Sequence, residues 1–494
     1  MTTNTGMPFP TTGEHFLAIL KRHAHEHPHR PALVADEQTL DYGTLWSWTE
    51  GIAQELAAQG LQRGQCVFLA MEPSLSGLLF HLGLLRLGVV TALLDPGLSI
   101  TQWSNRVQDL APTTIIAPSP ILAEIHKNTP WQGRSIDLSS TVLENLTPSS
   151  QALPECPDTN DPVLILGTTG TTGPVKYVLL TLGNISAATS HINATMGIRD
   201  TDVEILTLPL HHSFGLGRLR CGLAAGACIH LVAGRFRPER LLKAVKGNHA
   251  TLFAQVPAGI RLLLALGNRV RPWLEGVRLV EIGSAPLEMD EKKRLMDLLP
   301  QAKLWHHYGL TEASRSLFLE YHDALQAGCL HALGRPAPGV ELQLSEAKDG
   351  EPRELLIRGP HVSPGYCIPG GRSYGVQPTN AWLATGDLVR LDERGTYYHV
   401  GRSDDVINLG GFKVHPQEIE SVLAACPGIA DVAVAFRGGQ LVAFIQNDST
   451  FQEQRALEWL QKRLEPYKHP QCYRLLDRVP RTESGKLLRR LLPD

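Results

Sequence analysis

A loop built from threonines and glycines stands out in the first half of the chain. It runs from Gly167 to Lys176 as Gly-Thr-Thr-Gly-Thr-Thr-Gly-Pro-Val-Lys, between the apolar runs 163–166 and 177–181, which read as strands. Glycine allows close backbone approach, and hydroxyl and backbone N–H groups both donate to oxyanions. A loop of this kind with a lysine at its exit can cradle a polyphosphate.

Two general interpretations of this loop compete at the outset. It is either a flexible turn without a ligand or the P-loop of an NTPase. A P-loop needs Gly-Lys-Ser/Thr leading directly into a helix, whose N-terminus holds the phosphate. Here Lys176 follows Pro174-Val175 and enters a strand, and no Ser or Thr follows it. This order disfavours the P-loop.

A second stretch with chemical potential is Tyr308-Gly309-Leu310-Thr311-Glu312, which follows the strand-like run 303–307. The tyrosine offers an aromatic face for a base, the threonine a hydroxyl for a phosphate oxygen, and Glu312 a hard oxygen ligand for Mg²⁺. Each residue alone is more often structural. Together, at the end of a strand, they favour a nucleotide site.

Other polar groups also follow expected strands. The stretch 211–215, His-His-Ser-Phe-Gly, follows the strand 203–208, and 283–287, Gly-Ser-Ala-Pro-Leu, follows the strand 277–282. Open α/β sheets place ligands at the carboxyl ends of their strands. Asp387, after Thr385-Gly386, suits either two ribose hydroxyls or an Asx turn. Lys486, after Ser484-Gly485, is either a solvated lysine or a residue that a mobile module swings into a site.

Strands alternate with helices through the first part of the chain, which predicts parallel α/β architecture. Residues 120–160 are polar and proline-rich and read as a connection. From 334 the pattern changes to short strands with turns, as in a distorted β-barrel or meander. The polar break at 401–405 is the expected domain boundary, and a small α+β module follows it. A chain of 494 residues is in any case long enough for two or more domains.

The composition is that of a globular protein, with 43% hydrophobic and 19% charged residues. The net charge of −3 gives no basic field for nucleic acid or anionic membrane. Eight scattered cysteines without a Cys-x-x-Cys pair suit reduced thiols. The N-terminus lacks signal-peptide features, and the most apolar window, 77–94, is interrupted by His81 and Arg86. We therefore expect a cytoplasmic protein without a membrane span. The alternating histidines at 23–29 suit a solvated helix end better than a metal clip.

Taken together, these stretches resemble the adenylate-forming superfamily, which includes acyl- and aryl-CoA synthetases, adenylation domains of peptide synthetases and luciferases. The resemblance covers essentially the whole chain, with at least six motifs in the family's order. It implies an α/β fold with a large N-terminal domain, 1–400, and a small mobile α+β lid domain, 401–494. The large domain would consist of two α/β subdomains, about 1–333, arranged as a five-layered sandwich, plus a distorted β-barrel, about 334–400. The glycine-threonine loop would be the family's phosphate loop.

The resemblance also implies a reaction. ATP converts a carboxylic acid to an acyl-adenylate with release of pyrophosphate, with Mg²⁺ as the metal. The acyl group is then transferred to a thiol. Coenzyme A is the expected acceptor, and the phosphopantetheine of a separate carrier protein is the alternative. No acidic residue follows the Pro209 motif to bind an α-amine, so a fatty or aromatic acid is expected. A non-catalytic ATP-binding protein and a P-loop-type ATPase are the alternatives from other classes.

By resemblance, specific residues receive roles. Lys486, Thr311, Glu312 and Lys176 are the expected catalytic residues, with Glu312 the metal ligand. Asp404 is the expected hinge, and Gly410 and Gly411 would face the thiol. The ATP site would consist of Thr168, Thr169, Gly170, Thr171, Thr172, Gly173, Lys176, Ser284, Ala285, Pro286, His307, Tyr308, Gly309, Thr311, Asp387, Arg402 and Lys486. The acid pocket would consist of His212, Ser213, Phe214, Gly215, Gly283, Gly309 and Ser314.

Some positions depart from the family's usual pattern. Thr169 replaces a serine but keeps the hydroxyl, while Val175 and Tyr177 replace a proline and a glycine and make the loop exit bulkier. Asn408 stands where many members carry lysine. Three arginines are unusual this close to the acid pocket, and each serves either a salt bridge or a second polar or acidic group on the substrate. They are Arg218, Arg220 and Arg315.

Overall fold

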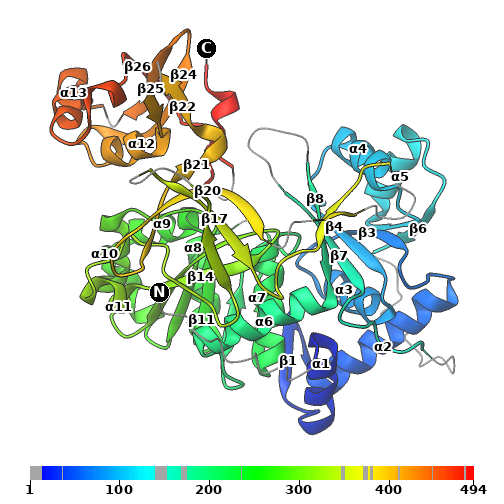
Figure 1. The fold of residues 1–494 in the computed structure, drawn as a ribbon. Helices are drawn as coiled ribbons and strands as arrows, with labels where there is room; N and C mark the ends of the chain where they lie inside the picture. The colour runs from blue at the N-terminus through cyan, green and yellow to red at the C-terminus, as the bar shows by residue number, and fades with distance from the viewer. Residues whose placement is uncertain are drawn as a thin grey trace.

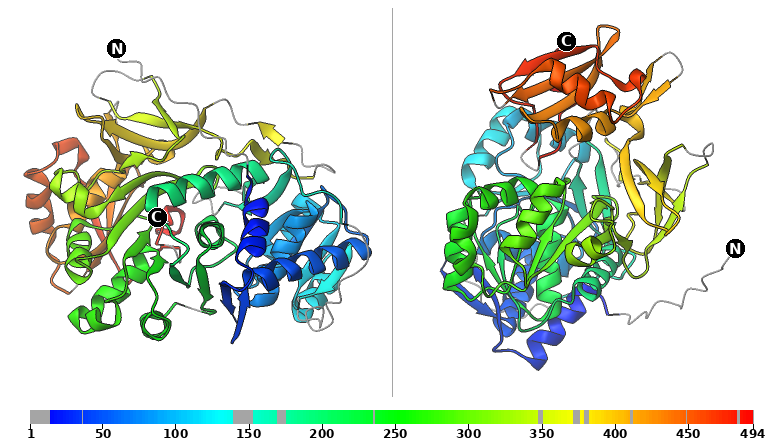
Figure 2. Two further views of the ribbon diagram at one scale, coloured as in Figure 1. Left: turned by 90° about the horizontal axis from the view of Figure 1, so that it is seen from below. Right: turned by 90° about the vertical axis from the view of Figure 1, so that its left-hand side faces the viewer.

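A computed structural model of the chain describes residues 14–35, 37–138, 153–168, 175–234, 236–346, 351–370, 376–378, 382–409, 412–447, 449–482 and 485–493. Within these residues two large sheets form the body of the molecule, and a small C-terminal part lies against one end of it (Figure 1). Figure 2 shows the same arrangement from two further sides, and in its right-hand view the C-terminal part again lies at one end of the body.

The first large sheet carries both ends of the glycine-threonine loop. Its strand order is β19-β18-β8-β7-β4-β3-β5-β6. Strands β3 to β7 pair in parallel, whereas β8 runs antiparallel to β7, so that the loop joins two neighbouring antiparallel strands. The strands are β3 (Cys66–Ala70), β4 (Val90–Leu94), β5 (Thr114–Ala117), β6 (Arg134–Asp137), β7 (Pro162–Gly167), β8 (Tyr177–Thr181), β18 (Gly365–Cys367) and β19 (Val376–Pro378).

The second large sheet carries the other expected site stretches. Its order is β15-β14-β13-β12-β11-β9-β10-β1-β2, with a parallel centre and antiparallel edges. The strands are β1 (Pro31–Ala35), β2 (Gln38–Asp41), β9 (Val203–Leu206), β10 (Cys228–Leu231), β11 (Leu252–Gln255), β12 (Leu279–Ile282), β13 (Lys303–Leu310), β14 (Ser314–Glu320) and β15 (Arg335–Pro336).

Helices separate and cover the two sheets. The helices are α1 (Phe16–Glu26), α2 (Tyr42–Ala58), α3 (Leu75–Leu87), α4 (Ile100–Leu110), α5 (Ser119–Asn128), α6 (Leu182–Met196), α7 (Ser213–Ala225), α8 (Pro238–Gly247), α9 (Pro257–Ala265), the 3₁₀ helix η1 (Gly267–Trp273), α10 (Met289–Leu298) and α11 (Tyr321–Gln326). One apolar core joins α1, α2, α3 and α7 to both sheets. A second core lies under α8–α10, and a third lies under α4 and α5. The layers therefore alternate helix, sheet, helix, sheet, helix, as the resemblance implies.

Local sequence signals account for where the helices begin and end. Helix α3 starts after Ser74, whose hydroxyl accepts from the Gly77 N–H at 3.1 Å, and it ends at Gly88 with φ of 76°. Helix α6 starts with a capping box between Thr181 and Asn184. Side-chain acceptors satisfy backbone donors that the first turn of a helix leaves unpaired.

The expectation for residues 120–160 is wrong in part. Helix α5 and the edge strand β6 occupy the first portion of this stretch, and residues 139–152 lie outside the described residues. The strand Arg-Ser-Ile-Asp buries only Ile136 fully, so its sequence lacks the apolar run by which the central strands are recognised.

The stretch after residue 334 forms a four-stranded antiparallel sheet, β16-β17-β20-β21. The strands are β16 (Glu341–Leu344), β17 (Arg353–Arg358), β20 (Leu383–Leu391) and β21 (Tyr397–Arg402). Leu355, Ile357 and Leu383 pack into a core shared with α6 and β14. The described pairings do not continue from β16 to β21, so closure into a barrel stays a prediction.

The C-terminal part begins after the short 3₁₀ helix η2 (Ser403–Asp405). It has an α+β composition with its own apolar core around Val434, Leu441 and Ile445. Its elements are β22 (Ile407–Leu409), β23 (Phe412–Val414), α12 (Pro416–Ala424), β24 (Ile429–Arg437), β25 (Gln440–Asn447), α13 (Glu453–Gln461), η3 (Pro466–Lys468), β26 (Cys472–Leu476) and η4 (Arg489–Leu491). After Lys486 the described chain forms only the short 3₁₀ helix η4.

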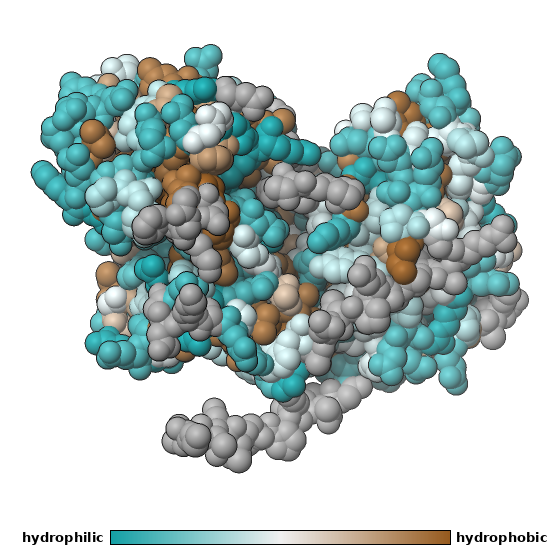
Figure 3. Space-filling view, turned by 45° about the horizontal axis from the view of Figure 1, so that its top comes forward, coloured by the Kyte–Doolittle hydropathy of each residue, from teal (hydrophilic) through white to brown (hydrophobic). Residues whose placement is uncertain are grey.

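Two general expectations can be compared with this fold. No helix among the described residues is long and apolar enough to cross a membrane. All eight cysteines are free thiols. Figure 3 shows one face of the molecule, which is mostly hydrophilic with scattered apolar side chains.

Candidate active site

The two described ends of the glycine-threonine loop are held together at the base. The Thr168 N–H donates to the Lys176 carbonyl at 2.8 Å, as expected for a loop that joins antiparallel neighbours. Tyr177 is buried, and its hydroxyl donates to Asp109 of helix α4 at 2.6 Å, so its ring packs between the sheet and this helix. The Lys176 ammonium lies 5.5 Å from the ring centre of Tyr366. Thr169, Gly170, Thr171, Thr172 and Gly173 lie outside the described residues.

Tyr308, Asp387 and Arg402 come together from three strands. The Tyr308 hydroxyl donates to Asp387 at 2.6 Å, and the Arg402 guanidinium donates to the same carboxylate at 3.2 Å. His399 also lies 3.2 Å from it. Burial alone would raise the pKa of Asp387, but His399, Arg402 and Tyr308 outweigh it and lower that pKa. A buried carboxylate held ionised among donors is suited to accept hydroxyl protons from a sugar.

Glu312 lies near this group, at the turn between β13 and β14. One of its carboxylate oxygens accepts from the Tyr366 hydroxyl at 2.8 Å, and its backbone carbonyl accepts from the Ser363 N–H at 2.7 Å. Tyr366 is also the ring beneath Lys176, so the loop lysine and Glu312 share a neighbour. One carboxylate oxygen that protein donors leave free suits Mg²⁺, which usually binds one or two carboxylates together with substrate phosphates. Among the described residues no cluster of three metal-ligating side chains exists.

The turn after β12 has a strained backbone. Ser284 has φ of 78°, a left-handed conformation that is rare outside glycine. The Ala285 carbonyl lies 3.0 Å from His306 Nε2, whose other ring nitrogen lies 2.8 Å from the Tyr321 hydroxyl. This holds the turn of Ser284, Ala285 and Pro286 beside β13, which carries Tyr308. Backbone strain of this kind is concentrated at functional sites.

Lys486 reaches the same region from the C-terminal part. Its backbone N–H donates to the Thr482 hydroxyl at 3.0 Å, and Arg481 pairs with Asp431 through two bonds of 2.7 Å. The residue before it, Gly485, has φ of 89° and faces Ala285. The tight turn therefore places the lysine at the large part of the molecule.

The surroundings of the Lys486 ammonium identify what it faces. The protein around it displaces solvent and lowers its pKa, and Arg402 acts in the same direction, whereas Asp387 and Glu312 act against it. Its side chain is still partly open to solvent. The Lys486 ammonium is therefore within electrostatic range of Asp387, Glu312 and Arg402.

His212 immediately precedes α7 and is also within electrostatic range of Lys486. Surrounding protein atoms, then His211 and Lys486, lower the pKa of His212 to about 4, with Asp95 acting in the opposite direction. The His211 ring lies 3.8 Å from Asp95, which follows β4 in the first large sheet. The histidine pair therefore stands where the carboxyl ends of both sheets meet.

The residues expected to line the acid pocket are brought together. Phe214 is in the first turn of α7, Gly283 directly follows β12, and Gly309 and Ser314 flank the β13–β14 turn. A Cβ at Gly309 would collide with the Ser314 carbonyl, so only glycine fits there. The Ser314 hydroxyl is buried and has no hydrogen-bond partner among the residues that the structure describes. A buried hydroxyl without a partner is uncommon and suits a polar group of a ligand.

His307 is placed with the acid-pocket residues rather than with Tyr308. Consecutive strand residues point to opposite faces, so His307 turns away from Asp387. Its Nδ1 lies 2.7 Å from Glu281 Oε1, and its ring makes an edge contact with Phe214 at 4.6 Å between centres. Its expected part in ATP binding stays a prediction that can involve only its backbone.

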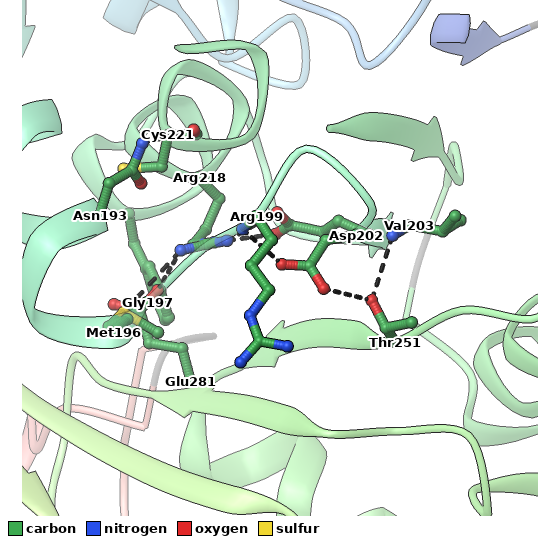
Figure 4. A network of polar contacts seen from close by, with 12 residues as sticks. Asn193, Met196, Gly197, Arg199, Asp202, Val203, Arg218, Cys221, Thr251 and Glu281 are labelled. Carbon is green, nitrogen blue, oxygen red and sulfur yellow. Dashed lines mark hydrogen bonds and ion pairs between the residues drawn. The ribbon is translucent and has the colours of Figure 1, made fainter. Parts of the chain in front are cut away.

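A buried ion network accounts for two of the three unusual arginines. Arg315 Nε donates to Glu281 at 2.6 Å, and Arg315 Nη2 donates to the Phe214 carbonyl at 3.0 Å. Arg218 donates to Glu204 at 2.7 and 2.8 Å and lies 3.2 Å from Glu281. Figure 4 shows the Arg218 end of this network beside Glu281. These two arginines therefore serve buried salt bridges.

Burial and charge act in opposite directions on the carboxylates of this network. Burial would raise the pKa of Glu281, but Arg315, His307 and Arg218 lower it below its ordinary value. Arg220 is also buried, and within the described part of the chain its Nε and one terminal nitrogen have no hydrogen-bond partner. Burial lowers the pKa of Arg220 to about 10.

Four contacts of the site were not anticipated from the sequence: Glu281, His399, Tyr366 and Asp95. The pairing of Asp387 with Arg402 in the β20–β21 hairpin was the available signal for His399, which lies three residues before Arg402 on the same strand. Tyr366 and Asp95 come from distant strands, and no local pattern points to them. Asp404, the expected hinge residue, is exposed in η2, and Gly410 and Gly411 lie outside the described residues.

Comparisons with known proteins agree with this geometry. A family model for AMP-binding enzymes matches residues 20–367, and the model for the C-terminal domain of AMP-binding enzymes matches residues 418–486. The chain is 27% identical to a 2-succinylbenzoate–CoA ligase of Bacillus licheniformis, covering 96% of this chain and 98% of that enzyme. It is also 27% identical to 4-coumarate–CoA ligase-like 2 of Arabidopsis thaliana, covering 94% and 88%.

Solved structures are similar over the same extent. ATP-bound MatB from Rhodopseudomonas palustris superimposes with a TM-score of 0.85 at 25% identity, covering 96% of this chain and 98% of that one. The o-succinylbenzoate CoA synthetase MenE of Bacillus subtilis with its acyl-adenylate OSB-AMP gives a TM-score of 0.83 at 25% identity, with the same coverage. The first family match alone spans well over half of the chain, and the chain therefore belongs to the family of AMP-binding enzymes.

Proposed function

We propose that this protein uses ATP to convert a carboxylic acid to an acyl-adenylate, releases pyrophosphate, and transfers the acyl group to coenzyme A. The observation that carries the proposal is the convergence of Tyr308 and Arg402 on the Asp387 carboxylate, at 2.6 and 3.2 Å, with Lys486 of the C-terminal part within electrostatic range of it. Relatives across the whole length of the chain are CoA ligases, which supports the thiol as acceptor.

The nucleotide would lie along the group that Tyr308 and Asp387 form. Asp387 and Arg402 would bind the ribose, and Ser284, Ala285, Pro286 and Tyr308 would enclose the adenine. Thr311 would contact the α-phosphate. The loop Thr168–Gly173 and Lys176 would hold the β- and γ-phosphates. Glu312 would hold Mg²⁺, which when bound neutralises phosphate charge.

The chemistry explains the need for a cation that spans two partners. The acid attacks the α-phosphorus as a carboxylate, so both reactants are anions that repel each other. An ammonium between them neutralises charge and aligns the attack, which is electrostatic preorganisation rather than covalent catalysis. Lys486 interacts electrostatically with Asp387, Glu312 and His212, which supports this role for its ammonium group.

The acid would be a fatty or aromatic one without an α-amine. Among the described residues at the start of α7, His212, Ser213, Phe214 and Gly215 offer no carboxylate to bind an ammonium group. The buried carboxylate Glu281 is already engaged by Arg315 and Arg218. A preference for an α-amino acid in pyrophosphate exchange would refute this assignment.

The second half-reaction would require the C-terminal part to move. We place the domain boundary at 400/401, with Asp404 as the hinge that absorbs the rotation and Gly410 and Gly411 beside the incoming thiol. A separate carrier protein could supply the thiol instead of coenzyme A. Incubation with ATP, acid and either thiol, followed by mass spectrometry of the thioester, separates the two acceptors. The free state of all eight cysteines supports the cytoplasm as the proposed compartment.

The test of the proposal is Lys486→Ala. Losing one preorganised charged group typically costs about 10²–10³ in rate, and a loss of this size is expected in acid-dependent ATP–pyrophosphate exchange, while ATP binding persists. Lys462→Ala, which removes an exposed lysine of the same C-terminal part, should leave the exchange unchanged. Full exchange by the Lys486 variant would overturn its assigned role. Release of ADP instead of AMP would overturn the proposed reaction.

A further inference from the structure

Three side chains form one layer at the inner end of the expected acid pocket. The Arg315 guanidinium stacks over the Phe214 ring at 4.9 Å from its centre, and the His307 ring meets the same ring edge-on at 4.6 Å. All three side chains are buried. They come from α7, β13 and β14, and these elements also carry most of the residues expected to touch the acid.

This layer fills the space that two glycines leave open. A Cβ on Gly283 would collide with the His307 imidazole, and a Cβ on Gly217 would collide with the Arg315 guanidinium. A glycine beside a pocket ordinarily gives room to a ligand. Here the room at both glycines is already taken by side chains of the protein.

Glu281 holds the layer in place from below. It is fully buried, accepts from Arg315 Nε at 2.6 Å and lies 2.7 Å from His307 Nδ1. Arg315 also donates to the Phe214 carbonyl at 3.0 Å. Moving Arg315 or His307 aside for a ligand would take a buried carboxylate away from its partners, which is strongly unfavourable. The layer is therefore a rigid wall and not a flexible plug.

We propose that the Phe214–Arg315–His307 layer is the closed end of the acid pocket, and that the enzyme accepts short or single-ring carboxylic acids and excludes long-chain fatty acids. This proposal rests on the proposed function and narrows its substrate class. Beyond Phe214 and Gly283 the volume is filled by the His307 imidazole and the Arg315 guanidinium, so a longer acid would have no room there. Ser314, one of the residues expected to line this pocket, has a buried hydroxyl without a hydrogen-bond partner among the described residues, and this hydroxyl would bond a polar atom of the bound acid.

The first experiment uses the unmodified protein. ATP–pyrophosphate exchange is measured with butyrate, hexanoate, benzoate, octanoate, dodecanoate and palmitate. One methylene that a pocket cannot take costs about 10-fold to 200-fold in specificity, so benzoate or butyrate should exceed dodecanoate by about 100-fold or more in kcat/KM.

Two variants then test whether this layer sets the limit. Phe214→Ala removes the ring but keeps the backbone carbonyl that Arg315 bonds, and Phe214→Leu is a milder change in case the first variant folds poorly. Each should raise kcat/KM for octanoate relative to butyrate, by about 10-fold for the alanine variant. The matched control for Phe214→Leu is Phe253→Leu, which makes the same side-chain change in β11 on the opposite face of the sheet. It should leave the preference among acids of different chain length unchanged.

The outcomes separate this inference from the proposed function. A preference for short or single-ring acids that shifts in the Phe214 variants supports the inference. Dodecanoate or palmitate as the best substrate of the unmodified protein, or an unchanged profile in folded Phe214 variants, overturns the inference and leaves the adenylation reaction standing. Exchange with none of the acids, by protein that binds ATP, overturns the proposed function and the inference with it.

Discussion

The two faces of the nine-stranded sheet differ in the charged side chains that they bury. Under α8, α9 and α10 the face is apolar, with Ile205, Phe253 and Ile282 in one continuous core. Under α6 and α7 the same strands bury Glu204 and Glu281, paired with Arg218 and Arg315. Strand β12 alone shows the contrast, because Val280 and Ile282 point to the apolar core while Glu281 points to the ion network.

This difference separates the face of the sheet that stabilises the fold from the face that holds the residues of the candidate site in position. Apolar burial contributes about 25 cal/mol per Å², whereas a buried ion pair gives little net stability because desolvation offsets the attraction. The charged face nevertheless carries Phe214, His307 and the β13–β14 turn, all of which belong to the candidate site. A network of this kind is best understood as holding those elements in one geometry.

The largest expected effect comes from breaking the charged face at its centre. Glu281→Gln keeps the shape of the side chain but leaves Arg315 buried without a carboxylate, which should destabilise the protein by about 3–5 kcal/mol. Urea unfolding followed by tryptophan fluorescence measures the change. The KM for the acid should also rise, because the Phe214–Arg315–His307 layer loses its support.

An exposed pair of the same chemistry serves as the control. Arg261 and Glu291 join α9 and α10 on the outside of the apolar face, at 2.6 Å, and Arg261 is 42% exposed. Arg261→Ala should cost about 1 kcal/mol or less. Equal costs for Glu281→Gln and Arg261→Ala would contradict the contrast between the two faces.

The next effect is a loss of stability in acid, which follows from histidines beside α6. His191 and His361 pack edge to face at 4.9 Å, and Ser316 Oγ lies 3.2 Å from His361. Burial lowers the pKa of His361 to about 4, and burial, with His361 and Arg315 nearby, lowers the pKa of His191 to about 3. An unfolded histidine titrates near 6.5, so the unfolded state binds more protons below that pH.

The sign follows from this difference. The stability that these histidines contribute is fully present above about pH 6.5 and is lost as the pH falls toward their folded pKa values. The melting temperature should therefore drop from pH 7 to pH 5. His191→Asn, which keeps a donor near the place of Nδ1, should make that drop shallower. The same pH slope in both proteins would contradict this prediction, because it would mean that the protonation of His191 does not differ between the folded and the unfolded state.

Among the buried positions, the smallest effect is expected on the apolar face. Ile282→Val removes one methylene from a fully buried side chain next to Gly283 in the chain, and should cost about 0.5–1.5 kcal/mol. Its kcat/KM in pyrophosphate exchange should be unchanged, because its side chain points away from the ion network. A loss of activity of about tenfold or more would mean that the apolar face also positions the site.

Much of the fold could be predicted because its signals are local. The apolar runs at 66–70 and 163–166 are central strands, and Ser74 and Gly88 mark the ends of α3. The edge strand β6 and helix α5 were not predicted, since an edge strand buries few residues and lacks a continuous apolar run. The proposed nucleotide residues were predicted from motifs, and the structure brings Tyr308 and Arg402 within hydrogen-bond distance of Asp387.

The sequence by itself determined the family resemblance, the alternation of strands and helices, and the stretches that carry chemistry, because each depends on residues close together in the chain. Only the tertiary structure decided what the arginines do. Arg218 and Arg315 had two open interpretations until Glu204 and Glu281, from separate strands, were seen to engage them. The side a strand residue faces, and the charge it meets there, are set by packing between distant segments, which no local pattern encodes.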